Sequence, residues 1–79
     1  MLKQMPLAKT IQVSGRKLIL RPESGTFLKG AMLIGLKEDR NITLVVRKVL
    51  PQTIECQLLD APSHWARPGM SFEPYHYKS

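Results

Sequence analysis

The hydrophobic pattern is most regular between Ile42 and Leu59, in the stretch ITLVVRKVLPQTIECQLL. The second half of this stretch alternates between apolar and polar residues, and its apolar face holds Ile54, Cys56 and Leu58. That period of two is typical of a strand with one face in water. The first half is rich in β-branched residues and apolar on both faces, which favours a central strand. Because Pro51 cannot donate to a sheet, the stretch predicts a β-hairpin connected at residues 50–52.

The first third of the chain contains two shorter β-prone runs, TIQV and RKLILR, on either side of Ser14-Gly15. A two-residue turn signal between such runs predicts a hairpin, and one long strand with a glycine bulge is the alternative. Pro22 is expected to end the second run. Residues 1–9 lack periodicity and carry Lys3 and Lys9, so we expect a flexible basic arm there.

The run FLKGAMLIGLK, Phe27 to Lys37, fits either a helix or a strand. Gly30 and Gly35 would each cost about 0.8 to 1.0 kcal/mol in a helix interior, whereas glycines mark bends in barrel strands. We therefore predict a strand, with one face formed by Leu28, Met32, Ile34 and Leu36. The polar residues 38–41 are expected to form a turn.

The chain beyond Leu59 changes to a loop pattern, because residues 60–70 contain two prolines and a glycine. We expect one short helical or 3₁₀ turn near residues 62–66, capped by Ser63. The last run, residues 71–77, is expected to be extended with Phe72 on one face, and Pro74 limits it to an edge strand or a strand end.

These elements predict an all-β fold with one small domain covering residues 1–79. Five or six short strands, spaced by about 8 to 15 residues, indicate a small antiparallel barrel. An SH3-like barrel is preferred over an OB-like one, because the helix that usually lies between the third and fourth OB strands has no place in this sequence.

The composition points to a polyanionic partner. Twelve Lys and Arg stand against six Asp and Glu, which gives a net charge of +6 and a pI near 9.9. Excess positive charge on a small domain favours DNA, RNA or an acidic protein surface. No apolar run is long enough for a membrane span or a signal peptide core, and the cysteine usage fits a reducing compartment, so a cytoplasmic location is expected.

Catalytic and metal-binding motifs are absent from the sequence. Cys56 is the only cysteine, and it falls on an apolar face, where a buried side chain is the ordinary interpretation. No spacing of Cys or His is typical of a metal site, and no nucleophile, acid–base or phosphate-loop motif occurs. We expect no metal, no cofactor and no enzymatic activity.

Aromatic and basic residues alternate at the end of the chain. Four of the five aromatic residues lie there, interleaved with basic ones: His64, Trp65, Arg67, Phe72, Tyr75, His76, Tyr77 and Lys78. Bases of single-stranded nucleic acids stack on exposed rings for about 1 to 3 kcal/mol each, and cations pair with phosphates. The alternative is that the rings cover the open end of a small core.

A second basic group lies on the first predicted hairpin, at Arg16, Lys17 and Arg21, and is joined by Lys3 and Lys9. An arm that contacts phosphate and a solvated, disordered arm are both open interpretations of the residues before the hairpin. A third, Arg47 with Lys48, ends the first arm of the central hairpin. Adjacent residues of a strand project to opposite sides, so Arg47 and Lys48 cannot serve one surface unless a bulge intervenes.

The order of LIL, ESG, ITLVVRKV and IECQLLDAP is similar to that in the small RNA-binding carbon-storage-regulator proteins. Seventeen residues precede the LIL strand here, however, and SFEPYHY has no counterpart of the basic residue that those proteins use for RNA. No family assignment follows, and no site residue is transferred.

The sequence therefore predicts a module that binds nucleic acid, DNA or RNA, through basic residues and exposed aromatics. The predicted contact residues are Arg16, Lys17, Arg21, His64, Trp65, Arg67, Tyr75, Tyr77 and Lys78. The alternative is a protein-interaction module, either a homo-oligomer that pairs sheet edges or buries the aromatic loop, or an accessory or inhibitor factor of a phage or mobile element. DNA versus RNA, sequence preference and oligomeric state stay open.

Overall fold

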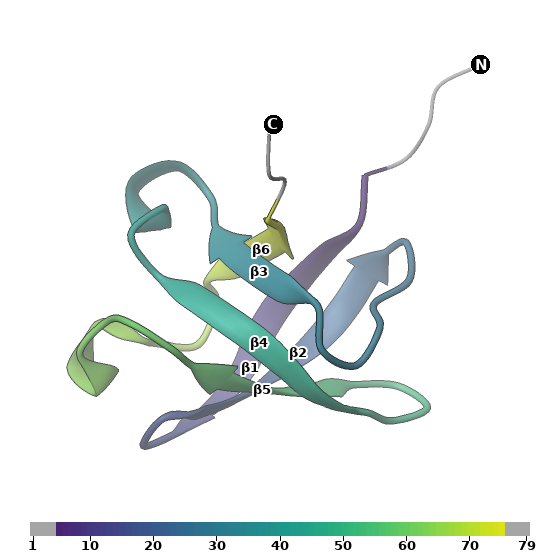
Figure 1. Cartoon of the computed structure of the whole chain (residues 1–79), viewed down its shortest axis with the longest axis horizontal. Coiled ribbons are helices and arrows are strands. Elements are labelled where there is room, and N and C mark those ends of the chain that lie inside the picture. Colours follow the sequence, from purple (N-terminus) through teal and green to yellow (C-terminus); the bar gives the residue numbers. More distant parts are fainter. Residues whose placement is uncertain (1–4, 76–79) are drawn as a thin grey trace.

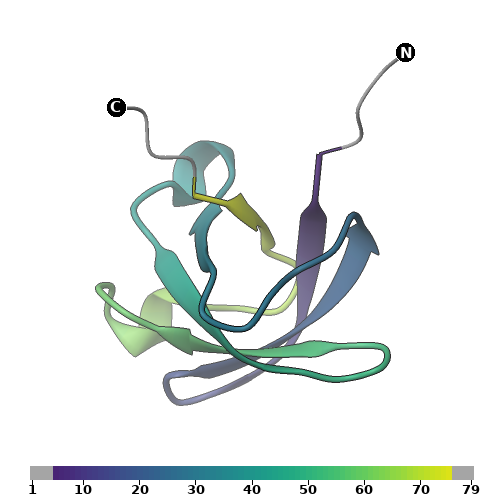
Figure 2. The ribbon, with the colours of Figure 1, turned by 45° about the vertical axis from the view of Figure 1, so that its right-hand side comes forward.

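Six antiparallel strands close into a barrel in the computed structural model, which describes residues 5–75. The strands are β1 (Leu7–Ser14), β2 (Lys17–Ser24), β3 (Met32–Gly35), β4 (Thr43–Val49), β5 (Ile54–Leu58) and β6 (Ser71–Pro74). Around the barrel their order is β1-β2-β5-β4-β3-β6, as Figures 1 and 2 show. Two 3₁₀ turns, η1 (Lys37–Asp39) and η2 (Ser63–Trp65), lie in the connections. The predicted small antiparallel barrel is confirmed, while its assignment as SH3-like stays a prediction.

The first β-prone runs form a hairpin rather than one bulged strand. Ser14 pairs with Lys17 across a two-residue turn in which Gly15 has φ 62°, as in the type II′ turn, which takes glycine first. Two boundaries predicted from the sequence are wrong. β1 already begins at Leu7, so residues 7–9 belong to the barrel, and β2 continues through Pro22 because β5 stops pairing at Leu20 and leaves an edge that tolerates proline.

The central hairpin forms as predicted, and it contains a bulge. β4 and β5 pair from Leu44 with Leu58 to Val49 with Ile54, and the Leu50 N–H donates to the Thr53 carbonyl at 2.9 Å in the turn. Between the pairs Val46–Cys56 and Lys48–Glu55, β4 has one extra residue, Arg47. A bulge of this kind changes which side the following residues face.

The third strand is shorter than predicted and presents the opposite residues to the core. Only residues 32–35 are extended, and residues 27–31 form a loop in which Phe27 is buried. Within β3, Leu33 and Gly35 face the interior, while Met32 and Ile34 lie on the outside. A Cβ at Gly35 would collide with the backbone of Asp39, so glycine is required for η1 to fold back against β3.

The connection to β6 is a loop with one short turn, as predicted. η2 lies within residues 62–66, but Ser63 makes no capping hydrogen bond, because Pro62 occupies the capping position. The loop is fixed to β4, since the Leu59 N–H donates to the Thr43 carbonyl and the Thr43 N–H donates to Asp60 Oδ1. β6 ends at Pro74 and closes the barrel by pairing with both β1 and β3.

The barrel interior is filled by one apolar cluster. Its members are Ala8, Leu18, Leu20, Phe27, Leu33, Ile42, Leu44, Val46, Ile54, Cys56, Leu58, Ala61, Met70 and Phe72. Burial of Cys56 and Phe72 is therefore confirmed. Thr10 is also buried, and its hydroxyl has no hydrogen-bond partner within residues 5–75. No helix in this part of the chain has the length and apolarity needed to cross a membrane.

Candidate nucleic-acid interface

Five cations from three strands lie on the outer surface of β1, β2 and β4. On β2, Leu18 and Leu20 point into the core, so Lys17 and Arg21 point outward. In the strand register, Lys9 on β1 stands opposite Arg21 on β2, and Lys48 on β4 stands opposite Glu55 on β5. We call this surface, which spans β1, β2, β5 and β4, the basic face, and its cations are Lys9, Lys17, Arg21, Arg47 and Lys48.

Four of these cations have no partner in the part of the chain that the structure describes. Lys17 Nζ lies 3.7 Å from Glu55 Oε2, and more than half of the lysine side chain is exposed, so this ion pair contributes little to stability. Neither an ion pair nor a side-chain hydrogen bond within residues 5–75 involves Lys9, Arg21, Arg47 or Lys48. The acidic residues of the basic face are Glu23 and Glu55, so its charge is positive.

The pair formed by Lys9 and Arg21 is unfavourable by itself. The two residues stand directly opposite each other on β1 and β2, and both are exposed. Like charges in directly opposed positions of neighbouring strands destabilise a sheet. An anion bound between the two side chains would remove this repulsion.

Arg47 and Lys48 both belong to the basic face because of the β4 bulge. Both side chains are exposed. A shallow surface depression of about 410 Å³ begins beside Arg47 and is lined by Ser14, Arg16, Lys17, Arg47, Glu55, Cys56 and Gln57. The bulge thus joins the end of β4 to the cations of the first hairpin.

Arg16 has a structural role. Its guanidinium donates to the Leu58 carbonyl at 3.1 Å and to the Ala61 carbonyl at 3.2 Å. The Leu58 N–H in turn donates to the Arg16 carbonyl at 2.8 Å. These bonds tie the tip of the first hairpin to the end of β5, so two donors of this predicted contact residue are already used.

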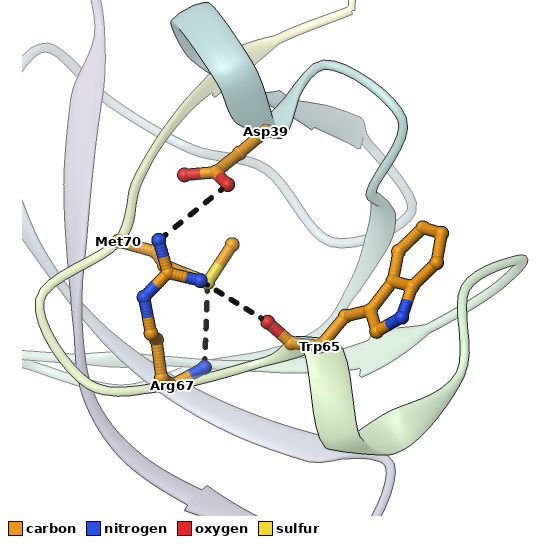
Figure 3. Close-up of polar contacts among 4 residues, drawn as sticks. All are labelled: Asp39, Trp65, Arg67 and Met70. Carbon is orange, nitrogen blue, oxygen red and sulfur yellow. Dashed lines mark hydrogen bonds and ion pairs between the residues drawn. The ribbon is translucent and has the colours of Figure 1, made fainter.

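The aromatic loop, which we define as His64, Trp65 and Arg67, lies beside acidic residues. The Arg67 guanidinium reaches Asp39 Oδ1 of η1 at 3.8 Å and donates to the Trp65 carbonyl at 3.4 Å (Figure 3). The Arg67 N–H also contacts Met70 Sδ at 3.3 Å. Arg67 therefore holds the loop against η1 and is partly neutralised.

The Trp65 ring is half exposed and points away from the Arg67 guanidinium (Figure 3). The His64 ring stands nearly perpendicular to it, with ring centroids 6.4 Å apart. The hollow in front of the ring has a volume of about 540 Å³ and is lined by Glu38, Asp39, Asn41, Ile42, His64, Trp65 and Arg67. Two carboxylates in this hollow make it a poorer place for phosphate than the basic face.

The remaining predicted aromatics do not join either group. Tyr75 is half exposed at the end of β6, where its N–H donates to the Met32 carbonyl at 2.8 Å. Tyr77 and Lys78, together with His76, lie outside the described residues. The structure thus separates the aromatic side chains that it describes from the basic face.

The single cysteine is unsuited to nucleophilic chemistry. Burial, together with the neighbouring charge of Glu55, raises the pKa of the Cys56 thiol to about 12. The thiol therefore stays protonated at neutral pH, and the thiolate is the reactive form. No group of three or more His, Cys, Asp or Glu residues within residues 5–75 could hold a metal ion.

Three cations of the basic face, Lys9, Arg47 and Lys48, were not among the predicted contact residues. From the sequence, Lys9 is expected in the arm before the first hairpin. Arg47 and Lys48 are expected on opposite sides of their strand unless a bulge intervenes. The presence of two adjacent cations at the end of an otherwise apolar strand was the available signal for a bulge.

Comparisons with protein-family models, curated proteins and solved structures found no match to this chain.

Proposed function

We propose that this protein is a non-enzymatic module that binds nucleic acid through the basic face. The observation that carries the proposal is the convergence of four exposed cations from three strands, none of which has an ion-pair partner within residues 5–75: Lys9, Arg21, Arg47 and Lys48. Phosphate groups bound at these side chains would release condensed counterions from the nucleic acid, which is the main source of sequence-independent affinity.

Local electrostatics supports the same surface. The repulsion between Lys9 and Arg21 lowers stability in the free protein and disappears when a phosphate lies between them. Among the predicted contact residues, Lys17 and Arg21 belong to this surface. Arg16 stabilises it by holding the tip of the first hairpin against the end of β5. The aromatic loop and Tyr75 lie elsewhere and are secondary in the proposal.

The test is a titration of labelled oligonucleotides followed by fluorescence anisotropy, at about 50 mM and about 200 mM salt. The binding variant replaces Lys9, Arg21, Arg47 and Lys48 by Gln. The control variant replaces Lys37 and Arg40, which are exposed cations at η1, outside the basic face. We expect salt-sensitive binding by the natural protein and the control, and a loss of at least about 100-fold in the binding variant. Absence of binding to every oligonucleotide at low salt would refute the proposal.

A second function, self-association, has one observation in its favour. Met32 and Tyr75 are each nearly half exposed on the outer sides of β3 and β6, with Ile34 beside them. We call these three residues the apolar face. Because every strand of the closed barrel has a neighbour on both sides, this face is a better surface for a homo-oligomer than a sheet edge. Light scattering over a range of concentrations tests it, with Met32→Gln expected to abolish any oligomer. An SH3-like class and a cytoplasmic location stay predictions.

A further inference from the structure

We infer that the basic face binds duplex DNA in preference to a single strand, with its two cation pairs on the two phosphate backbones that border the major groove. The inference rests on the proposed function and adds the class of nucleic acid. Its two parts are the pair Lys9 and Arg21, and the pair Arg47 and Lys48.

The strand register gives the separation of the two pairs. Ile19 on β2 stands opposite Glu55 on β5, which stands opposite Lys48 on β4. Arg21 lies two residues further along β2, so Arg21 and Lys48 are separated by two residues along a strand and two strands across. With a rise of about 3.4 Å per residue and about 4.8 Å between strands, the Cα atoms of Arg21 and Lys48 are about 12 Å apart. This is close to the width of the major groove of B-form DNA, about 12 Å.

The surface between the two pairs is not suited to a continuous phosphate track. Ile19 and Glu55 occupy it, and the Glu55 carboxylate already holds the cation beside it, because its Oε2 atom lies 3.7 Å from Lys17 Nζ. A single strand laid across this surface would bring its phosphates to the carboxylate. Two backbones, one on each side of a groove, keep their phosphates at the cations and leave Glu55 over the groove.

The basic face also lacks the rings that single strands need. Sequence-tolerant binding of a single strand combines a cationic groove with aromatic side chains on which bases stack. Within residues 5–75, Phe27 and Phe72 are buried in the core, Trp65 belongs to η2, and Tyr75 lies at the end of β6. A single strand on the basic face would therefore gain phosphate contacts without stacking.

The shape of the surface favours a groove as well. The outside of a closed barrel is convex, and Figure 2 shows the strands curving around the interior. A convex surface can lie across a groove and touch both of its borders, but it cannot enclose a flexible strand. Contacts limited to phosphates position a protein without reading sequence, so we expect little sequence preference.

The experiment compares duplex DNA, one of its strands, and duplex RNA of the same sequence across a salt series. Variants are Lys9→Gln with Arg21→Gln, Arg47→Gln with Lys48→Gln, and the control Lys37→Gln with Arg40→Gln at η1, each of which removes two charges. With four phosphate contacts, affinity for duplex DNA should fall about 150-fold between about 50 and 200 mM salt. Each binding variant should reduce that fall to about 12-fold, and the control should keep it.

The outcomes separate this inference from the proposed function. At about 50 mM salt we expect duplex DNA to bind at least about tenfold more tightly than the single strand or the RNA duplex, whose major groove is deep and narrow. Tighter binding of the single strand or of the RNA duplex would overturn the inference and leave nucleic-acid binding intact. An unchanged salt dependence in either binding variant would overturn the two-backbone arrangement. Absence of binding to all three would refute the proposed function itself.

Discussion

The basic face and the apolar face belong to the same barrel but differ in whether their charged side chains have partners of opposite sign. On β3 and β6 the one acidic side chain, Glu73, is matched, because its Oε2 atom lies 3.4 Å from Arg40 Nη1. Of the other outward positions there, Met32 and Ile34 are apolar and Ser71 is polar but uncharged. On the basic face, by contrast, four cations are left without acidic partners in the described part of the chain.

The difference shows that charge is arranged and not merely abundant. A protein selected only for solubility could intersperse both signs over its surface. Here two like charges even stand directly opposed at Lys9 and Arg21, at a cost to stability. A bound polyanion on the basic face would remove that cost. Near the apolar face, where no polyanion is proposed to bind, the charged Glu73 has an opposite-charge partner.

Gly35→Ala should have the largest effect on stability, and it tests the packing of η1 against β3, the strand that carries the apolar face. The added methyl group would collide with the backbone of Asp39 and displace η1, for a loss of about 3 kcal/mol in the free energy of unfolding. Gly15→Ala, at the tip of the basic-face hairpin, meets no atom within 4 Å and should lose only about 1 kcal/mol from its positive φ. Urea unfolding measures both. Equal losses would contradict the close approach of η1 to β3.

Arg16→Gln should separate a structural cation from the binding cations. It removes two guanidinium bonds to the Leu58 and Ala61 carbonyls, for a loss of about 2 kcal/mol in stability. The salt dependence of DNA binding should stay as in the natural protein. If stability were unchanged and the salt dependence fell instead, Arg16 would belong to the binding surface.

Thr10→Val should stabilise the seam between β1 and β6, where the two faces meet. The backbone of Thr10 is bonded to Met70 and Gly69, but its buried hydroxyl has no partner within residues 5–75. Replacing the hydroxyl by a methyl group of similar shape should raise the free energy of unfolding by about 1 kcal/mol. A loss of stability on thermal unfolding would show that the hydroxyl is hydrogen-bonded in solution.

Lys9→Glu should improve stability while weakening DNA binding. It replaces the repulsion between residues 9 and 21 by attraction, for a gain of about 0.5 kcal/mol. Lys9→Gln should give a smaller gain, because it removes the repulsion without adding attraction. Calorimetry together with anisotropy titration checks both quantities. A variant that binds DNA as tightly as the natural protein would exclude Lys9 from the interface.

Tyr75→Ala should have the smallest effect on binding, less than about twofold in affinity for any oligonucleotide. A ring on which a base stacks contributes about 1 to 3 kcal/mol, and Tyr75 lies on the apolar face beside Met32. A loss of tenfold or more in affinity for single-stranded DNA would show that Tyr75 belongs to the binding site.

The sequence predicts the fold well where periodicity is strong. The alternation around Cys56 predicts the central hairpin, and the clustering of turn residues after Leu59 predicts the long loop. The turn signal at Ser14-Gly15 leaves a hairpin and a bulged strand open, and the structure has the hairpin. The third strand was harder, because residues 32–36 are apolar on both faces and only packing decides that Leu33 points inward.

The candidate site was predicted only in part, for two physical reasons. The membership of Lys9, Arg47 and Lys48 depends on pairing register and on one bulge, which local sequence does not determine. The aromatic and basic residues near the chain end alternate in sequence, but Arg67 is directed to Asp39, and Tyr75 lies beside Met32 on another strand. Proximity in sequence was therefore a poor guide to proximity on the barrel surface.

The most direct test of the basic face is a backbone-amide NMR titration of the ¹⁵N-labelled protein with duplex DNA at low salt. The account predicts that the largest chemical-shift changes occur at Lys9, Arg21, Arg47 and Lys48 and their strand neighbours. Met32, Tyr75 and the aromatic loop should change little. Changes concentrated at the aromatic loop or the apolar face, with the basic face silent, would contradict the account.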